Sequence, residues 1–139
     1  MKKMLVLPLS LTLFVLACGG AKALRSVTDD LQSTVREYND LLKQNELDKA
    51  ELFTVESVRE EFEARAKAAK NVKVTDYRIL RTDFETLKGE EMVEVKFDYY
   101  IPPSATLRTV LDEQKWSFVY AKDEKRKVWR LMSPLPEFK

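Results

Sequence analysis

The residues Val-Glu-Val-Lys-Phe-Asp-Tyr-Tyr-Ile, at positions 93–101, decide the fold class of this chain. Apolar and polar side chains alternate along them. Because successive residues of a β-strand point to opposite faces, the alternation predicts a strand with one buried and one solvated face. Pro102 and Pro103 follow directly and are expected to end the strand, since proline donates no ladder hydrogen bond.

Three further stretches, on either side of this one, also predict strands. They cover about Val72–Glu85, with a change of phase at Thr75–Asp76 that indicates a bulge, then 107–121 and 128–133. Their connections are of hairpin length, which predicts an antiparallel sheet. The third strand places the following residues on one face: Val110, Asp112, Gln114, Trp116, Phe118 and Tyr120.

The part of the chain before these strands predicts helices, because its apolar residues recur every three or four positions. The predicted helices are Val27–Gln44 with Ser26 as N-cap, Leu47–Phe53, and Val55–Lys70 with Thr54 as N-cap. A sheet with one apolar face needs a cover. The order therefore predicts an α+β domain, with N-terminal helices packed on a four-stranded antiparallel sheet.

The first residues are typical of an exported protein. Lys2 and Lys3 precede an apolar run, Met4–Leu16, that is shorter than the ~20 residues of a membrane span, which indicates a signal peptide. Val15-Leu16-Ala17-Cys18 resembles the lipobox of bacterial lipoproteins, which implies cleavage before Cys18 and lipidation of that cysteine. Alternatively, Ala21-Lys22-Ala23 fits an ordinary signal peptidase, which would release a protein without a cysteine.

The lipobox divides the chain into three parts. These are a signal peptide at 1–17, the lipidated Cys18 with a tether at 18–25, and a single domain at 26–139. Gly19 stands where an aspartate favours inner-membrane retention in the lipoproteins that this sequence resembles. The resemblance thus implies the outer membrane, facing the periplasm, in a Gram-negative organism, or the outer surface of the plasma membrane in a Gram-positive one.

Composition excludes several classes of function. The chain has no histidine and one cysteine, which argues against Ser-His-Asp and Cys-His catalysis and the usual zinc sites. We expect no metal and no cofactor. Of 24 basic residues, Lys2 and Lys3 leave with the leader, so 22 basic residues face 23 acidic ones. This near-neutral balance predicts no nucleic-acid partner.

Four segments carry a family resemblance: Asp48–Phe53, Thr54–Ser57, Trp116–Tyr120 and Val128–Leu131. In this order they resemble the nuclear transport factor two-like superfamily, also called cystatin-like. Its helices pack into a curved sheet to form a cone. The resemblance spans about residues 31–133 and implies that fold, but no single activity, because the superfamily contains enzymes, binding domains and scaffolds.

In enzymes of that superfamily, groups inside the cone transfer protons. Asp112 is the weak catalytic candidate: inside an apolar cone its pKa would rise and suit a general base, whereas near the rim it would be solvated. The candidate ligand-pocket residues, which could equally form a filled core, are Tyr38, Tyr77, Tyr99, Gln114, Trp116 and Trp129. The charged loop 122–127 predicts a solvated hairpin tip, with anionic headgroups or an envelope protein as the alternative contact.

These features together predict a lipid-anchored lipoprotein of the cell envelope. We expect its domain to bind or scaffold another envelope component without catalysis. The alternative is a small-molecule-binding domain, or a cofactor-free enzyme, that uses the cone cavity. The expected partners are the membrane, through Cys18, and an envelope protein; the oligomeric state does not follow from the sequence.

Overall fold

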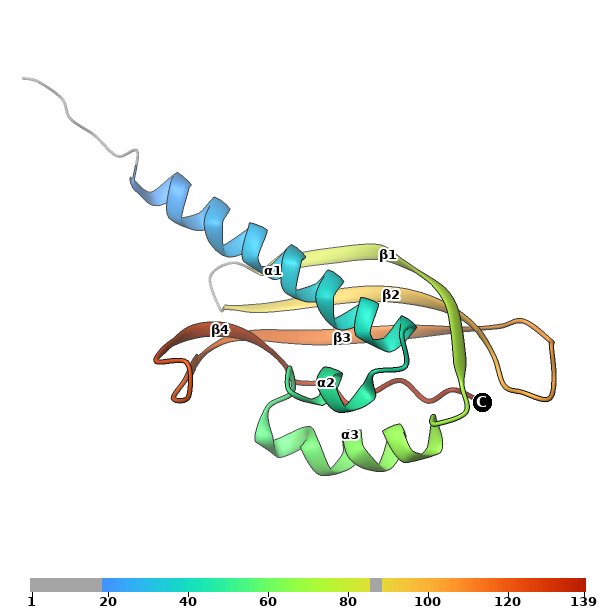
Figure 1. Ribbon diagram of the computed structural model, residues 1–139. Coiled ribbons are helices and arrows are strands. Elements are labelled where there is room, and N and C mark those ends of the chain that lie inside the picture. Colours follow the sequence, from blue (N-terminus) through green and yellow to red (C-terminus); the bar gives the residue numbers. More distant parts are fainter. Residues whose placement is uncertain (1–18, 86–88) are drawn as a thin grey trace, which may run out of the picture.

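The computed structural model describes residues 19–85 and 89–139, with side chains placed for 26–83 and 89–139. Three helices come first and four strands follow (Figure 1). The elements are α1 (Gly19–Lys43), α2 (Leu47–Glu51), α3 (Glu56–Ala68), β1 (Lys73–Glu85), β2 (Glu90–Tyr100), β3 (Arg108–Ala121) and β4 (Arg126–Leu131). The predicted leader, its lipobox and Cys18 lie outside the described residues. None of the helices in the described ranges is long and apolar enough to cross a bilayer.

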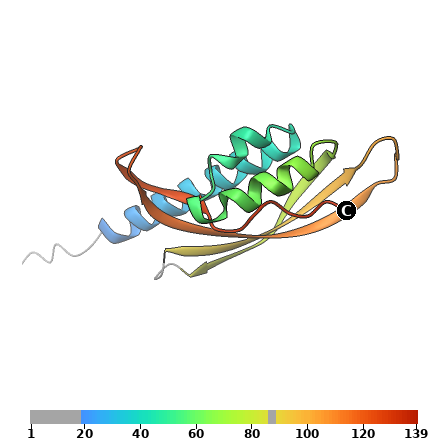
Figure 2. The same ribbon diagram turned by 90° about the horizontal axis from the view of Figure 1, so that it is seen from below.

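The strands form one antiparallel sheet in the order β1-β2-β3-β4. All three helices lie on the same face of this sheet, which we call the covered face (Figure 2). The α+β prediction, with helices packed on a four-stranded antiparallel sheet, is therefore confirmed. The bulge predicted at Thr75–Asp76 is also present, as a register shift between Val74 and Asp76, and a second shift lies between Ile79 and Arg81.

The register places the predicted apolar side of β2 in the core. Val93 pairs with Gln114, and Val95 pairs with Asp112. Val93, Val95 and Phe97 are at most 1% exposed, whereas the residues between them are half-buried on the open face. Alternation along one strand therefore gave the correct face for the whole sheet, because hydrogen-bonded neighbours share that face.

The first helix starts eight residues earlier than predicted, at Gly19 rather than Val27. Ser26 lies inside α1 and is not its N-cap. The segment 19–25, expected to be a tether, is helical. The long helix rises about 37 Å over its 25 residues. Its N-terminal turns project away from the domain (Figure 1), and the indole nitrogen of Trp129 donates to the Val27 carbonyl at 3.1 Å where the helix meets the sheet.

The connection between α2 and α3 also differs from its prediction. Thr54 is not the N-cap of α3; Val55 holds that position, and no side chain caps the helix there. The Thr54 hydroxyl instead donates to the Glu51 carbonyl at 2.7 Å, and the Thr54 backbone forms a parallel bridge with Leu131. Leu131 N donates to Phe53 O at 2.7 Å, and Val55 N donates to Leu131 O at 3.0 Å. The connection thus covers the free edge of β4 at Leu131.

After β4, the C-terminal segment 132–139 returns across the covered face. Leu135 is fully buried, and Arg65 of α3 donates to its carbonyl at 2.8 Å. Phe138 makes edge-on ring contacts with Phe97 and Tyr99, at centroid separations of 6.1 and 5.0 Å. The segment therefore fills the part of the covered face that the helices leave open.

Candidate functional site

The structure brings four of the predicted site residues together under α1. Asp112, Gln114 and Trp116 follow one another on the covered face of β3, and Tyr38 packs on them from α1. Tyr38, Gln114 and Trp116 are 0% exposed, and Asp112 is 7% exposed. Tyr38 and Trp116 meet edge to face at 5.5 Å. The cluster is thus a filled region of core.

Hydrogen bonds join the polar members of this cluster to α1. Gln114 Nε2 donates to Asn39 Oδ1 at 2.7 Å and to Asp112 Oδ2 at 2.9 Å. Asn39 Nδ2 donates to Gln114 Oε1 at 3.3 Å and to the Val35 carbonyl at 2.7 Å. Trp116 Nε1 reaches Gln114 Oε1 at 3.4 Å. Because a buried amide without partners is costly, this network stabilises the pairing of α1 with β3. We call Asn39, Asp112 and Gln114 the buried polar cluster.

Asp112 is buried within this cluster and is not solvated at a rim. Its burial raises the pKa of its carboxyl to about 7, because the charged form loses its hydration. The Gln114 hydrogen bond and then the Arg65 guanidinium oppose this rise in pKa, while Glu113 adds to it. A carboxyl with this pKa exchanges its proton near neutral pH, which is the chemical property of a general base.

The hydroxyl of Tyr38 lies beside the buried polar cluster but is not part of its hydrogen-bond network. Its oxygen is buried, and within the described residues it has no hydrogen-bond partner. Burial raises its pKa well above the usual value, and the nearby Asp112 carboxyl raises it further. The phenol therefore stays protonated and is a hydrogen-bond donor without an acceptor.

The remaining predicted pocket residues do not join the cluster. Tyr77 of β1 donates to Asp40 Oδ1 of α1 at 2.8 Å, and burial followed by this hydrogen bond raises its pKa to about 12. Tyr99 of β2 donates to the Lys139 carbonyl at 2.6 Å. Trp129 of β4 is bonded to Val27, as described above. Each ring is thus held by a structural contact with α1 or the C-terminal segment.

Two residues of this region carried no prediction. Asn39 lies four positions after Val35 and therefore on the buried side of α1, so a polar residue in the apolar phase was the available signal. Arg65 had no such signal, because the C-terminal carbonyl that it binds is 70 residues away in the sequence. In the described ranges, no group of three or more His, Cys, Asp or Glu side chains is arranged to hold a metal ion.

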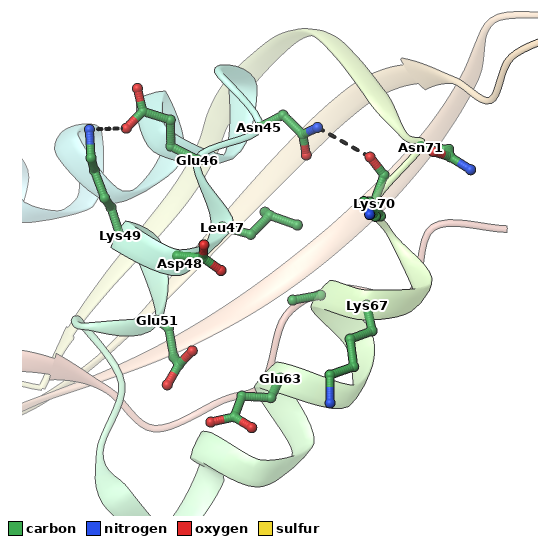
Figure 3. Close-up of a pocket in the computed structure, with 11 residues that line it drawn as sticks. Asn45, Glu46, Leu47, Asp48, Lys49, Glu51, Glu63, Lys67, Lys70 and Asn71 are labelled. Atoms are coloured by element: carbon green, nitrogen blue, oxygen red, sulfur yellow. Dashed lines mark hydrogen bonds and ion pairs between the residues drawn. The ribbon is translucent and has the colours of Figure 1, made fainter.

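Open space lies on the surface of the domain. A groove of about 750 Å³ runs between α2 and α3, where Glu46, Asp48, Glu51, Glu63 and several lysines line it (Figure 3). Burial and then the neighbouring Glu63 raise the pKa of Glu51. The groove is mixed in charge, and its rim is tied by the Lys49–Glu46 ion pair and by an Asn45–Lys70 hydrogen bond of 3.2 Å.

A second groove, of about 920 Å³, lies between α1, the α2–α3 connection and the hairpin of β3 and β4. Phe53, Phe118 and Trp129 contribute its aromatic part, and Phe118 and Trp129 pack at 5.1 Å. Tyr120 stands at its outer side and is 60% exposed. Tyr120 was predicted to share the buried face of Trp116, but burial stops alternating in that phase at the end of β3, where Tyr120 is exposed and Ala121 is buried.

Comparison with known proteins yields a likeness of fold. No protein-family model matches the chain, and no curated protein matches it significantly. A solved structure, a SEC-C motif-containing protein from Psychrobacter arcticus, superposes with a TM-score of 0.60 at 13% identity. The match covers 80% of this chain and 63% of that one, so this chain spans less than two thirds of its structural neighbour. At this identity the likeness shows the α+β fold alone.

Proposed function

We propose that this protein is a lipid-anchored lipoprotein of the cell envelope whose domain binds or scaffolds another envelope component without catalysis. The observation that carries the non-catalytic part is the filled covered face. Tyr38, Gln114 and Trp116 are 0% exposed, and the C-terminal segment closes the remaining side. An enzyme site needs a concave space for substrate next to its acid or base, and here the acid is enclosed by side chains.

The lipobox supports the anchor, and the shape of α1 is compatible with it. The chain is already helical at Gly19, where the described residues begin, and Trp129 of β4 donates to the carbonyl of Val27, eight residues later. Eight helical residues rise about 12 Å, so they would hold the domain near the bilayer surface. In a Gram-negative organism we propose the outer membrane, facing the periplasm, as its location.

We also propose membership of the nuclear transport factor two-like superfamily. The four segments that carry the resemblance support it, as does the placement of three helices on one face of a four-stranded antiparallel sheet. A curved sheet that forms a cone is the finer part of this proposal.

Metabolic labelling with a fatty-acid analogue tests the anchor. The wild-type protein should be labelled and sediment with membranes, and the Cys18→Ala variant should remain unlabelled. If both proteins are unlabelled and the wild type is found in the soluble fraction with a new N-terminus after Ala23, the anchor is wrong. Crosslinking in intact membranes then tests the scaffold: an envelope protein neighbour should be captured, and repeated capture of none would contradict the binding role.

A small-molecule-binding or cofactor-free enzyme domain is the second candidate. The observation that favours it is the pairing of Asp112, with a pKa of about 7, with the unpartnered Tyr38 hydroxyl. A ligand that enters between α1 and the sheet would meet an acid–base group and a donor. Thermal shifts with a metabolite set test it: a ligand that stabilises the wild type but not Asp112→Asn would support this candidate, and no stabilising ligand would count against it.

A further inference from the structure

One end of the molecule carries both the start of α1 and the hairpin of β3 and β4 (Figures 1 and 2). Two contacts fix this arrangement. Trp129, near the base of the hairpin, donates to Val27 of α1, and Asp30 of α1 lines one groove together with hairpin residues. A surface to which the N-terminal end of α1 is attached would therefore also lie close to this hairpin.

The hairpin tip has excess positive charge. Residues 122–127 contain four basic side chains and two acidic ones, and all six residues are exposed. The negative charge of Glu124 is balanced by two arginines, because its carboxylate accepts hydrogen bonds from Arg126 at 2.9 Å and from Arg130 at 2.8 Å. Lys122, Lys125 and Lys127 project to solvent, and no ion pair to them is found within the described part of the chain.

An aromatic side chain stands beside these lysines. Tyr120 pairs across the strands with Lys127, and the residue is 60% exposed. Tyrosine beside lysine is typical of the membrane–water interface, where the ring reaches the acyl boundary and the ammonium group meets phosphate. In the segment that leads to this end, Lys22 and Arg25 are present in the sequence and no acidic residue precedes Asp29.

We propose that the β3–β4 hairpin docks on anionic phospholipid headgroups of the membrane that holds the protein. Lys122, Lys125 and Lys127 would contact the phosphates, and Tyr120 would insert at the headgroup level. The proposal rests on the lipid anchor of the proposed function, because the anchor places the hairpin beside the bilayer at high effective concentration. Docking at this second point would fix the orientation of the two grooves and of the open face of the sheet relative to the membrane.

Lysine footprinting on vesicles tests this proposal. The mature full-length protein is reconstituted into phosphatidylcholine vesicles with or without phosphatidylglycerol, treated with an amine-reactive reagent, and analysed by mass spectrometry. Labelling of Lys122, Lys125 and Lys127 should fall several-fold in the anionic vesicles and recover at about 1 M salt, where screening shortens the Debye length to ~3 Å. Lys67 and Lys70, which are exposed at the C-terminal end of α3, are internal controls.

Equal labelling of the hairpin in both kinds of vesicle would overturn the proposal, as would a parallel loss at Lys67 and Lys70. Protection in native membranes but not in anionic vesicles would assign the hairpin to a protein partner instead, and would also overturn it. The Gln variants lack the labelled amines, so they are compared by amide hydrogen exchange of residues 120–127. Anionic vesicles should slow this exchange in the wild type and in Lys67→Gln/Lys70→Gln, but not in Lys122→Gln/Lys125→Gln/Lys127→Gln. Flotation with neutral vesicles reports the anchor separately, so failure of the anchor and failure of hairpin docking give different results.

Discussion

The side-chain amides of Asn39 and Gln114 exchange two hydrogen bonds, at 2.7 and 3.3 Å, although 75 residues separate them in the sequence. The pair joins α1 to β3 in a region from which water is excluded, since both side chains are 0% exposed. Two buried amides that satisfy each other specify one register of the helix on the sheet, because any shift leaves both unpaired.

The first prediction concerns this amide pair. Asn39→Leu and Gln114→Leu should each lower the free energy of unfolding by about 1–3 kcal/mol, because each leaves a buried amide without its partner. The double variant should lose less than the sum of the two, since it leaves no orphaned amide in the pair. Urea denaturation measures all three; Gln32→Leu, at an exposed position of α1, is the control. Strictly additive losses would contradict the coupling.

The second prediction is a pH dependence due to Asp112. Its pKa rises from 3.8 to about 7 on folding, so between these values the folded state holds a proton that the unfolded state releases. The contribution of Asp112 to stability is therefore fully present below pH 4 and is lost as the pH rises through 7. Relative to Asp112→Asn, the wild type should lose up to about 4 kcal/mol over this range.

Denaturant unfolding of both proteins at about pH 4 and about pH 8 measures this difference. Asp123→Asn, on the exposed hairpin, should follow the wild type. If the wild type and Asp112→Asn show parallel pH profiles, the carboxyl does not titrate in the folded protein as the structure indicates.

The third prediction concerns the hold of Arg65 on the C-terminal segment. Arg65→Gln removes the 2.8 Å bond to the Leu135 carbonyl, so residues 133–139 should exchange their amide hydrogens faster. The same change removes a positive charge that lowers the pKa of Asp112, so the pH dependence described above should move to higher pH. Arg59→Gln, on the same helix but paired with Glu51 and Glu56, should change neither property.

The fourth prediction compares two leucines that undergo the same change. Leu135→Ala should cost about 2–5 kcal/mol, because Leu135 is 0% exposed and its loss leaves a cavity under the C-terminal segment. Leu52→Ala, at a side chain that is 69% exposed, should change stability by no more than about 0.5 kcal/mol. Thermal or urea unfolding checks both. Equal effects would show that the C-terminal segment is not docked in solution.

Local sequence patterns predicted the strands and their buried face, but they did not predict the contacts that other parts of the chain make with the sheet. Alternation in β2 and β3 gave the covered face, including the positions of Asp112 and Gln114, because strand geometry imposes a period of two. The surroundings of Asp112 depend on Asn39 of α1, which binds its neighbour Gln114, and on the charge of Arg65 in α3, which no local pattern relates to β3. Thr54 was misassigned as a cap for the same reason: its backbone partner, Leu131, lies on β4.

The edges of the sheet bear on how crowded copies of this protein would behave. An uncovered strand edge offers unpaired backbone groups to a neighbour and favours aggregation. At one edge, β4 has six residues, and Phe53–Val55 pair with its last one. At the other edge, two register shifts interrupt β1, and Arg78, Arg81 and Asp83 place charges along it. Copies of this protein that meet side by side would therefore find no straight edge, along the described residues of β1 and β4, on which to extend the sheet, and would stay dispersed at high concentration.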